Sequence, residues 1–263
     1  MTSISLHPMP ARDTVAREQV SAVGVALRKA GLIFVSVLAV LGILPVVAAV
    51  RAAQYPNNHM GFSYGIGAAI PIALVGLFVP FTVWRREDPS RRSYHWAMPI
   101  ARVPHTLMKV LAGWLWLMAA VVVYLVFMIA IGWLMSVITG STFHREWTGA
   151  WEWAVPFTAA TVAYLLSTVA VLASDHPWGW IGGIGIGYLM VIVFLHALNM
   201  NDAARALTSV TDGYYGLGAA MFAKLETSRY GGPASASRWI GSALIWGALG
   251  AAGVVIAAYR RPG

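Results

Sequence analysis

The sequence predicts an all-α, polytopic membrane protein with six transmembrane helices and both termini in the cytoplasm. Three observations support this prediction: the composition, the long apolar runs and the placement of the basic residues. Of the 263 residues, 59% are hydrophobic and only 11% are charged, whereas a soluble domain carries roughly 25% charged residues. Such a chain is suited to solvation by lipid.

Six apolar runs approach or exceed the roughly 20 residues that a helix needs to cross a bilayer. They are Leu32–Val50, Phe62–Trp84, Val110–Thr139, Ala154–Ala173, Trp180–Leu198 and Trp239–Tyr259. Within lipid a helix satisfies its own backbone hydrogen bonds, so these runs are predicted to be helical. Together they form one transmembrane domain that covers residues 1–263. A β-barrel would instead show shorter segments of alternating polarity.

The Lys and Arg residues indicate the orientation of these spans. With the N-terminus inside, twelve of the 18 basic residues fall on the inner side: Arg12, Arg17, Arg28, Lys29, Arg85, Arg86, Arg91, Arg92, Arg102, Lys109, Arg260 and Arg261. The outer side then holds Arg51, Arg145, Arg205, Lys224, Arg229 and Arg238. This bias favours both termini in the cytoplasm. The predicted location of the chain is the cell inner membrane. The net charge of +8 therefore points to anionic membrane lipids and not to nucleic acid.

Two segments outside the spans have structure of their own. Residues 13–30 are expected to form an amphipathic interface helix, with Val15, Val20, Val23 and Leu27 on one face; a disordered lead-in is the alternative. The extracytoplasmic segment 199–238 contains an Ala-rich helical stretch, Asp202–Val210, followed by a Gly-rich stretch. Its apolarity fits either a partly re-entrant helical hairpin, covered by protein at membrane depth, or an ordinary surface loop.

No catalytic centre, cofactor site or metal site is recognisable. The chain has no cysteine and no G-x-x-x-x-G-K-[ST] phosphate loop, and its seven histidines form no H-x-x-x-H pair. His196 is the one histidine inside a predicted span, and the adjacent Asp175 and His176 belong to an inner turn, where they do not converge as an acid–base pair would. Charged residues are nearly absent from the spans, which argues against an ion-coupled carrier.

Glycines and prolines mark where spans pack or bend. Gly183 and Gly187 have the small-x-x-x-small spacing that lets helices approach closely. They fit either tight packing within one subunit or a face between two subunits. Pro71, Pro80 and Pro156 are positions where helices can kink.

The segment 85–109, between the second and third spans, is the most informative part of the sequence. It contains Arg85-Arg86-Glu87-Asp88-Pro89-Ser90-Arg91-Arg92, then Met98-Pro99-Ile100-Ala101-Arg102, and ends at Lys109. This pattern resembles the loop after span two of type-2 ATP-binding-cassette (ABC) permeases, in which an acidic-basic cluster precedes a Leu-Pro-[Val/Ile]-[Ser/Thr]-Arg pattern. Met98 and Ala101 depart from that pattern, while Leu111-Ala112-Gly113 fits the usual start of span three.

The resemblance implies a membrane-spanning permease subunit of an ATP-driven ABC exporter. In that family the loop after span two is a coupling helix that docks on a separate cytoplasmic ATPase subunit. Carried over by position, the ATPase-coupling residues are Glu87, Arg91, Arg92, Pro99 and Arg102. The resemblance further implies a second permease chain as a homo- or heterodimer partner, with ATP and Mg²⁺ held by the ATPase. This chain would then need no cofactor and would not itself be an enzyme.

Two other interpretations stay open at this point. The chain could be a non-transporting membrane subunit that anchors or assembles a larger complex. It could also be a membrane enzyme acting on lipids through His144, Glu146 and Glu152 in an outer loop, although these residues match no known motif. The absence of charge within the spans suggests a hydrophobic or amphipathic substrate if the chain is a transporter.

Overall fold

The computed structural model describes residues 12–53, 62–64, 69–84, 102–140, 143–145, 150–174, 176–222 and 235–260. Within these residues the chain is almost entirely helical, as predicted. Five helices are long and apolar enough to cross a membrane: α1 (Arg12–Ala53), α4 (Arg102–Thr139), α5 (Val155–Ala173), α6 (Pro177–Ala197) and α9 (Ala236–Arg260). A multi-pass membrane protein follows from these helices.

The second predicted span is shorter than expected. Its helix, α2 (Ala69–Trp84), has 16 residues, a length of about 24 Å against a hydrocarbon core of about 30 Å. Phe62–Tyr64, predicted to be part of this span, instead forms strand β1, which pairs in parallel with β2 (Phe143–Arg145). The prediction of a helix over 62–64 was therefore wrong. Aromatic and apolar residues suit a strand as well as a buried helix, so composition did not separate the two.

The first helix also differs from its prediction. Residues 13–30 and the first span form the single helix α1, 42 residues long. No proline interrupts the chain between Arg12 and Leu44, so the helix propagates from one segment into the other. Val20, Val23 and Leu27 do share a face, but this face packs on the protein core. The expected separation of an interface helix from a span is absent.

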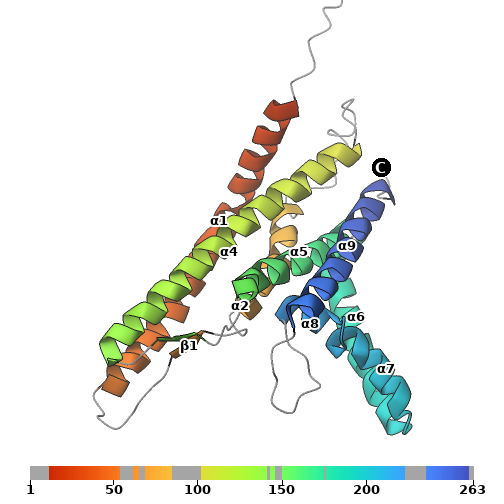
Figure 1. Ribbon diagram of the computed structural model, residues 1–263. Helices are drawn as coiled ribbons and strands as arrows, with labels where there is room; N and C mark the ends of the chain where they lie inside the picture. The colour runs from red at the N-terminus through yellow and green to blue at the C-terminus, as the bar shows by residue number, and fades with distance from the viewer. Residues whose placement is uncertain are drawn as a thin grey trace, which may run out of the picture.

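Contacts between helices fix their relative directions. In α1 and α4, Gln19 lies beside His105 and Gly24 beside Trp116, so the two helices run parallel and side by side (Figure 1). In the same way α2, α5 and α9 run parallel to one another, as the packing of Ala69 on Val155 and of Gly250 on Leu165 shows. They run antiparallel to α4, where Trp114 meets Thr161 of α5.

These directions define two faces of the bundle. We call the face where α1 begins and α9 ends the terminal face, and the other the opposite face; both of these helix ends lie at the top of Figure 1. The terminal face also holds Trp84 at the end of α2, Arg102 at the start of α4 and Pro177 at the start of α6. The opposite face holds β1, β2 and the 3₁₀ helix η2 (Ala150–Ala154).

The core lies where α2, α4 and α5 meet. Ile72, Leu117, Tyr124 and Tyr164 are almost completely buried there. The helix α5 is central, since 61% of its most apolar stretch is buried within the chain, whereas none of the corresponding stretch of α6 is buried. Figure 1 shows α6 leaving the bundle on the side away from α1 and α4, accompanied by α7 (Asn201–Asp212). Most of the surface of α6 is therefore available to lipid or to another chain.

Candidate functional site

The residue just before the predicted coupling segment 85–109, Trp84, touches the last residue of that segment, Lys109. Trp84 closes α2, and Lys109 lies two turns into α4. The Lys109 Nζ stands 4.3 Å from the centroid of the Trp84 ring, within the range of a cation–π interaction. The indole is buried and contacts a residue 25 positions further along the chain. The two ends of the predicted segment are thereby held together on the terminal face.

Most of the predicted coupling residues lie outside the described part of the chain. Glu87, Arg91, Arg92 and Pro99 fall within 85–101, of which the structure describes nothing. Arg102 is the first residue of α4, and its side chain is not described. The stretch 102–109, expected to belong to the loop, forms the first two turns of α4.

Aromatic side chains near Trp84 pack the end of α2 against the start of α6 on the terminal face. The Trp178 ring, near the start of α6, stacks on Phe81 of α2 with ring centroids 3.9 Å apart and lies 5.5 Å from Phe78. Pro177 occupies the first turn of α6, where its missing N–H costs nothing. In the turn before it, the His176 backbone N–H donates to the Ser174 hydroxyl; Asp175, predicted to belong to this turn, is not among the described residues. The end of α2 therefore packs against both α4 and α6.

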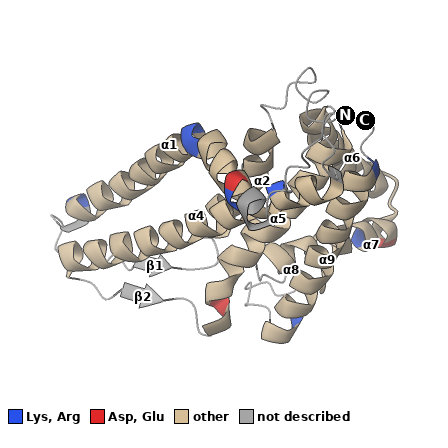
Figure 2. Cartoon of the chain, turned by 90° about the horizontal axis from the view of Figure 1, so that it is seen from above, with Lys and Arg blue, Asp and Glu red and all other residues tan. Residues whose placement is uncertain are grey.

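Polar groups within the spans are directed at backbone and at one another. The Tyr164 hydroxyl donates to the Val110 carbonyl at 2.7 Å, and the Ser167 hydroxyl donates to the Leu77 carbonyl at 2.6 Å. Figure 2 shows how few charged residues the described helices carry. From Val110 to Thr139 of α4, and throughout α2 and α5, there is no Asp, Glu, Lys or Arg. Hydrogen bonds of this kind hold helices together in lipid without burying charge.

The segment 199–238, predicted to be extracytoplasmic, contains a helical hairpin that turns back along the bundle. α7 confirms the predicted helix over Asp202–Val210, and α8 (Leu217–Phe222) follows after a turn at 213–216. The Ser242 hydroxyl donates to the Gly216 carbonyl at 2.7 Å, and the Trp246 indole N–H to the Tyr215 carbonyl at 3.0 Å. Because Ser242 and Trp246 are six and ten residues into α9, the turn lies about 9–15 Å along that helix from its N-terminal end.

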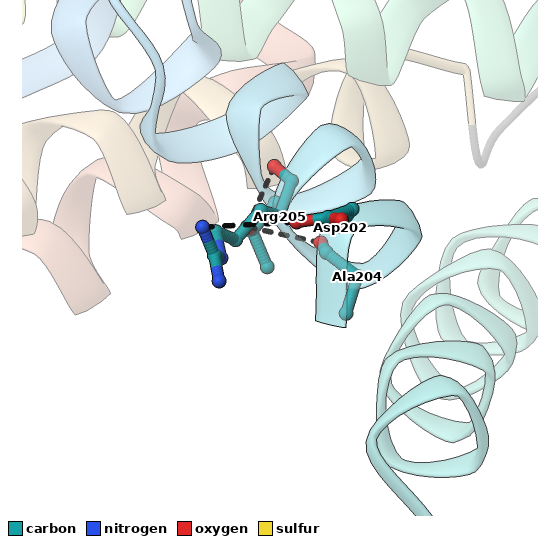
Figure 3. Close-up of polar contacts among 4 residues, drawn as sticks. Asp202, Ala204 and Arg205 are labelled. Carbon is teal, nitrogen blue, oxygen red and sulfur yellow. Dashed lines mark hydrogen bonds and ion pairs between the residues drawn. The ribbon is translucent and has the colours of Figure 1, made fainter. Parts of the chain in front are cut away.

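On α7 the polar residues interact locally. Arg205 and Asp202 form an ion pair at 3.7 Å, and the Thr208 hydroxyl donates to the Ala204 and Arg205 carbonyls (Figure 3). The two charged side chains are 79% and 99% exposed, so the pair contributes little to stability. On the side of α7 toward α6, the Tyr188 hydroxyl lies 2.8 Å from the Thr211 hydroxyl. These contacts align α7 with α6.

The glycine spacing in α6 has no partner among the residues that the structure describes. A Cβ added at Gly183 or Gly187 would meet no atom within 4 Å. Packing within one subunit, one of the two explanations for this spacing, is therefore not what the structure shows. His196, near the end of the same helix, bonds through Nδ1 to the Ile192 carbonyl, an arrangement typical of a structural histidine.

The residues of the enzyme hypothesis are not seen to converge. Glu152 is 2% exposed within η2, His144 belongs to β2, and Glu146 is outside the described residues. No group of three or more His, Asp or Glu side chains that could hold a metal ion occurs among the residues that the structure describes. Compared with known proteins, the chain matches no family model, no curated protein and no solved structure.

Sequence reasoning missed the contact between Trp84 and Lys109. The sequence shows an aromatic residue at the end of one span and a lysine at the start of the next on the same side, but it does not show that their side chains meet. It also missed the β1–β2 pairing, which joins two segments on the opposite face.

Proposed function

We propose that this chain is the membrane-spanning permease subunit of an ATP-driven ABC exporter in the cell inner membrane. It forms part of the translocation path and couples through residues 85–109 to a separate cytoplasmic ATPase subunit, which holds ATP and Mg²⁺. A second permease chain completes the path. The substrate is hydrophobic or amphipathic, in keeping with the absence of charge from the spans.

The observation that carries this proposal is the contact between Trp84 and Lys109. A segment that receives force from a partner must pass it on to the membrane helices. Here the segment is anchored at both ends, at one level of the bundle, by α2 and α4. The same α2 packs along α5 through Gly76 and Ala160 and against α6 through Phe81 and Trp178. Movement of the segment would therefore reach several spans at once.

The arginines of the segment suit a protein partner. A guanidinium pairs with a carboxylate through two parallel hydrogen bonds, which gives orientation as well as affinity. Six of the 18 basic residues of the chain lie between Arg85 and Lys109. Anionic lipid would be attracted to the same charge, but it needs neither the turn that Pro99 favours by sequence nor the helix start that Pro104 favours in the first turn of α4.

The test is the association and coupled activity of an ATPase subunit. Charge reversal at Arg91, Arg92 and Arg102 is expected to abolish co-purification of the ATPase, or its stimulation by the chain in liposomes. Reversal at Arg51 and Arg205, two exposed residues toward the opposite face, is the matched control and should leave both unchanged. Full coupled ATP hydrolysis in the triple variant would refute the assignment of this segment.

The orientation of the variants must be checked, since basic residues also set topology. The chain contains no cysteine, so single cysteines can report on each face without a background signal. A triple variant that inserts correctly and loses the ATPase supports docking, whereas an inverted chain supports a topological role alone.

A non-transporting anchor subunit is the second candidate, and the exposed length of α6 favours it. An anchor would retain its partners in the charge-reversal variant and would show no ATP-dependent movement of substrate.

A further inference from the structure

A cavity of about 230 Å³ opens between α1, α2 and α4, in the half of the bundle toward the terminal face. Its lining is apolar except for one charged residue, Arg28. Leu27 and Phe34 of α1, Val75 and Val79 of α2, and Trp116 of α4 form most of its wall. Sites for drug-sized molecules usually have about 300–1,000 Å³, so this cavity suits a narrower occupant such as a single hydrocarbon chain.

The cavity is elongated along α1. Its α1 residues run from Gly24 to Phe34, a distance of about 15 Å along the helix axis. On α4 the lining begins at Trp116, about 10 Å along the helix from Lys109. The Trp116 ring forms a fixed wall, because its indole N–H donates to the Val20 carbonyl at 3.0 Å and its edge lies against Gly24.

Arg28 lies at this cavity without an ionic partner among the residues whose side chains the structure describes. Its side chain is exposed. On α1 the nearest described carboxylate is Glu18, ten residues earlier and about 15 Å along the axis. Asp202 pairs with Arg205 instead, and Glu152 lies at the opposite face. By sequence Arg28 precedes the predicted span Leu32–Val50, where the head of an arginine can reach the phosphates of a leaflet.

We propose that this cavity binds one acyl chain of an anionic phospholipid from the leaflet on the terminal face, with its phosphate on Arg28. The guanidinium supplies charge-assisted hydrogen bonds to the phosphate oxygens. The apolar wall between Leu27 and Phe34 covers the acyl chain of the lipid. The lipid acts as a bound structural component and would be held whether or not an ATPase partner is present, so this site stands apart from the proposed function.

The structure offers two variants with matched controls. Arg28→Gln removes the charge at the cavity, and Lys29→Gln removes the same charge from the next residue, which does not line it. Gly31→Leu adds a bulky side chain at a residue that lines the cavity, and a Cβ at Gly31 meets no atom within 4 Å. Gly247→Leu makes the same change in α9, where a Cβ also meets no atom within 4 Å.

The experiment is native mass spectrometry of the purified full chain, equilibrated with equal amounts of phosphatidylglycerol and phosphatidylcholine of identical acyl chains. The wild-type chain should retain one phosphatidylglycerol in preference to phosphatidylcholine. Arg28→Gln should weaken that retention about tenfold, the effect of losing a hydrogen bond to a charged group, and Lys29→Gln by much less. Gly31→Leu should reduce the retention of both lipids. Gly247→Leu should leave the retention of both unchanged.

Three results would overturn the proposal. They are equal retention of the two lipids by the wild-type chain, equal weakening by Arg28→Gln and Lys29→Gln, and undiminished binding in Gly31→Leu. If Arg28→Gln does not give a monodisperse protein, Gly31→Leu with its control decides the matter, because that pair leaves all charges in place.

Discussion

The Lys109 ammonium lies over the buried Trp84 indole, 4.3 Å from the ring centroid, and joins the end of α2 to the start of α4. Between these residues runs the cationic segment that resembles the coupling region of ABC permeases. A cation–π contact contributes about 0.5–1 kcal/mol at exposed sites and about 2 kcal/mol when desolvated. The partial burial of Lys109 and the nearly complete burial of Trp84 place this contact between those limits.

A double-mutant cycle on Lys109→Gln and Trp84→Leu should give a coupling energy of about 1 kcal/mol. The measurement is unfolding of the purified chain by a denaturing detergent. In the complex with an ATPase, Lys109→Gln should also lower stimulated ATP hydrolysis. The matched control is Arg238→Gln at the opposite face, where the guanidinium lies 3.7 Å from the Tyr214 ring centroid. An equal loss of coupled hydrolysis in that control would contradict a special role for Lys109.

The spans that the sequence predicted best are those with long apolar runs and clear ends. For α5, Ala154–Ala173 was predicted and Val155–Ala173 is helical. For α6 and α9 the predicted bounds differ from the observed ones by at most three residues. Where a run is bounded by a proline or by indoles at the membrane interface, composition alone indicates the element.

The predictions failed where helix and strand share the same residue types or where two segments merge. Phe62–Tyr64 forms a strand through pairing with Phe143–Arg145. This partner lies some eighty residues further along the chain, so the local sequence did not indicate the pairing. The contact of Lys109 with Trp84 depends on how α2 and α4 are rotated about their axes. A single sequence carries no direct signal for such a rotation, so the faces that meet became visible only in the structure.

Sidedness can be tested by labelling single cysteines in a chain that naturally has none. Arg17→Cys on α1 and Ser235→Cys before α9 are both exposed and lie toward different faces. With a cytoplasmic terminal face, an impermeant maleimide added to intact spheroplasts should label Ser235→Cys but not Arg17→Cys. Both should react after permeabilisation. Labelling of both positions from one side would show that the 16-residue α2 does not complete a crossing.

Gly76 is expected to be required for the packing of α2 on α5. A Cβ at this position would collide with the backbone of Ala160, lying 3.1 Å from its Cα and closer still to its carbonyl oxygen. Gly76→Ala should therefore destabilise the chain by about 1–3 kcal/mol, the usual cost of overpacking. Gly247→Ala, with open space at its Cβ, should be neutral or stabilising by up to about 1 kcal/mol. Detergent-induced unfolding would compare the two, and equal stabilities would contradict the close approach.

The turn between α7 and α8 should depend on its two hydrogen bonds to α9. Ser242→Ala combined with Trp246→Phe removes the donors to Gly216 and Tyr215. The expected cost is about 1–2 kcal/mol, because in each case a carbonyl loses one donor. A cysteine at Ala220, which is fully buried on α8, should react with maleimide slowly in the parent chain and faster in the double variant. Unchanged protection would show that apolar packing alone holds the hairpin.

The glycine face of α6 should mediate contact with a second permease chain. Gly183 and Gly187 lie one turn apart on one face, and a Cβ at either would meet no atom of the described residues within 4 Å. Replacing both with Ile should weaken self-association of the purified protein, since small residues at such a face let helices approach closely. Resonance energy transfer between chains labelled at Ser235→Cys would measure the effect in liposomes.

Gly185→Ile is the control, because Gly185 lies on the other side of α6 and its Cβ also meets no atom within 4 Å. It adds the same bulk to the same helix while leaving the proposed contact untouched. Loss of energy transfer in the double variant alone would assign the face. If the control weakens association equally, the exposed surface of α6 serves a different purpose, such as contact with lipid, and the glycine face is not the contact with the proposed second chain.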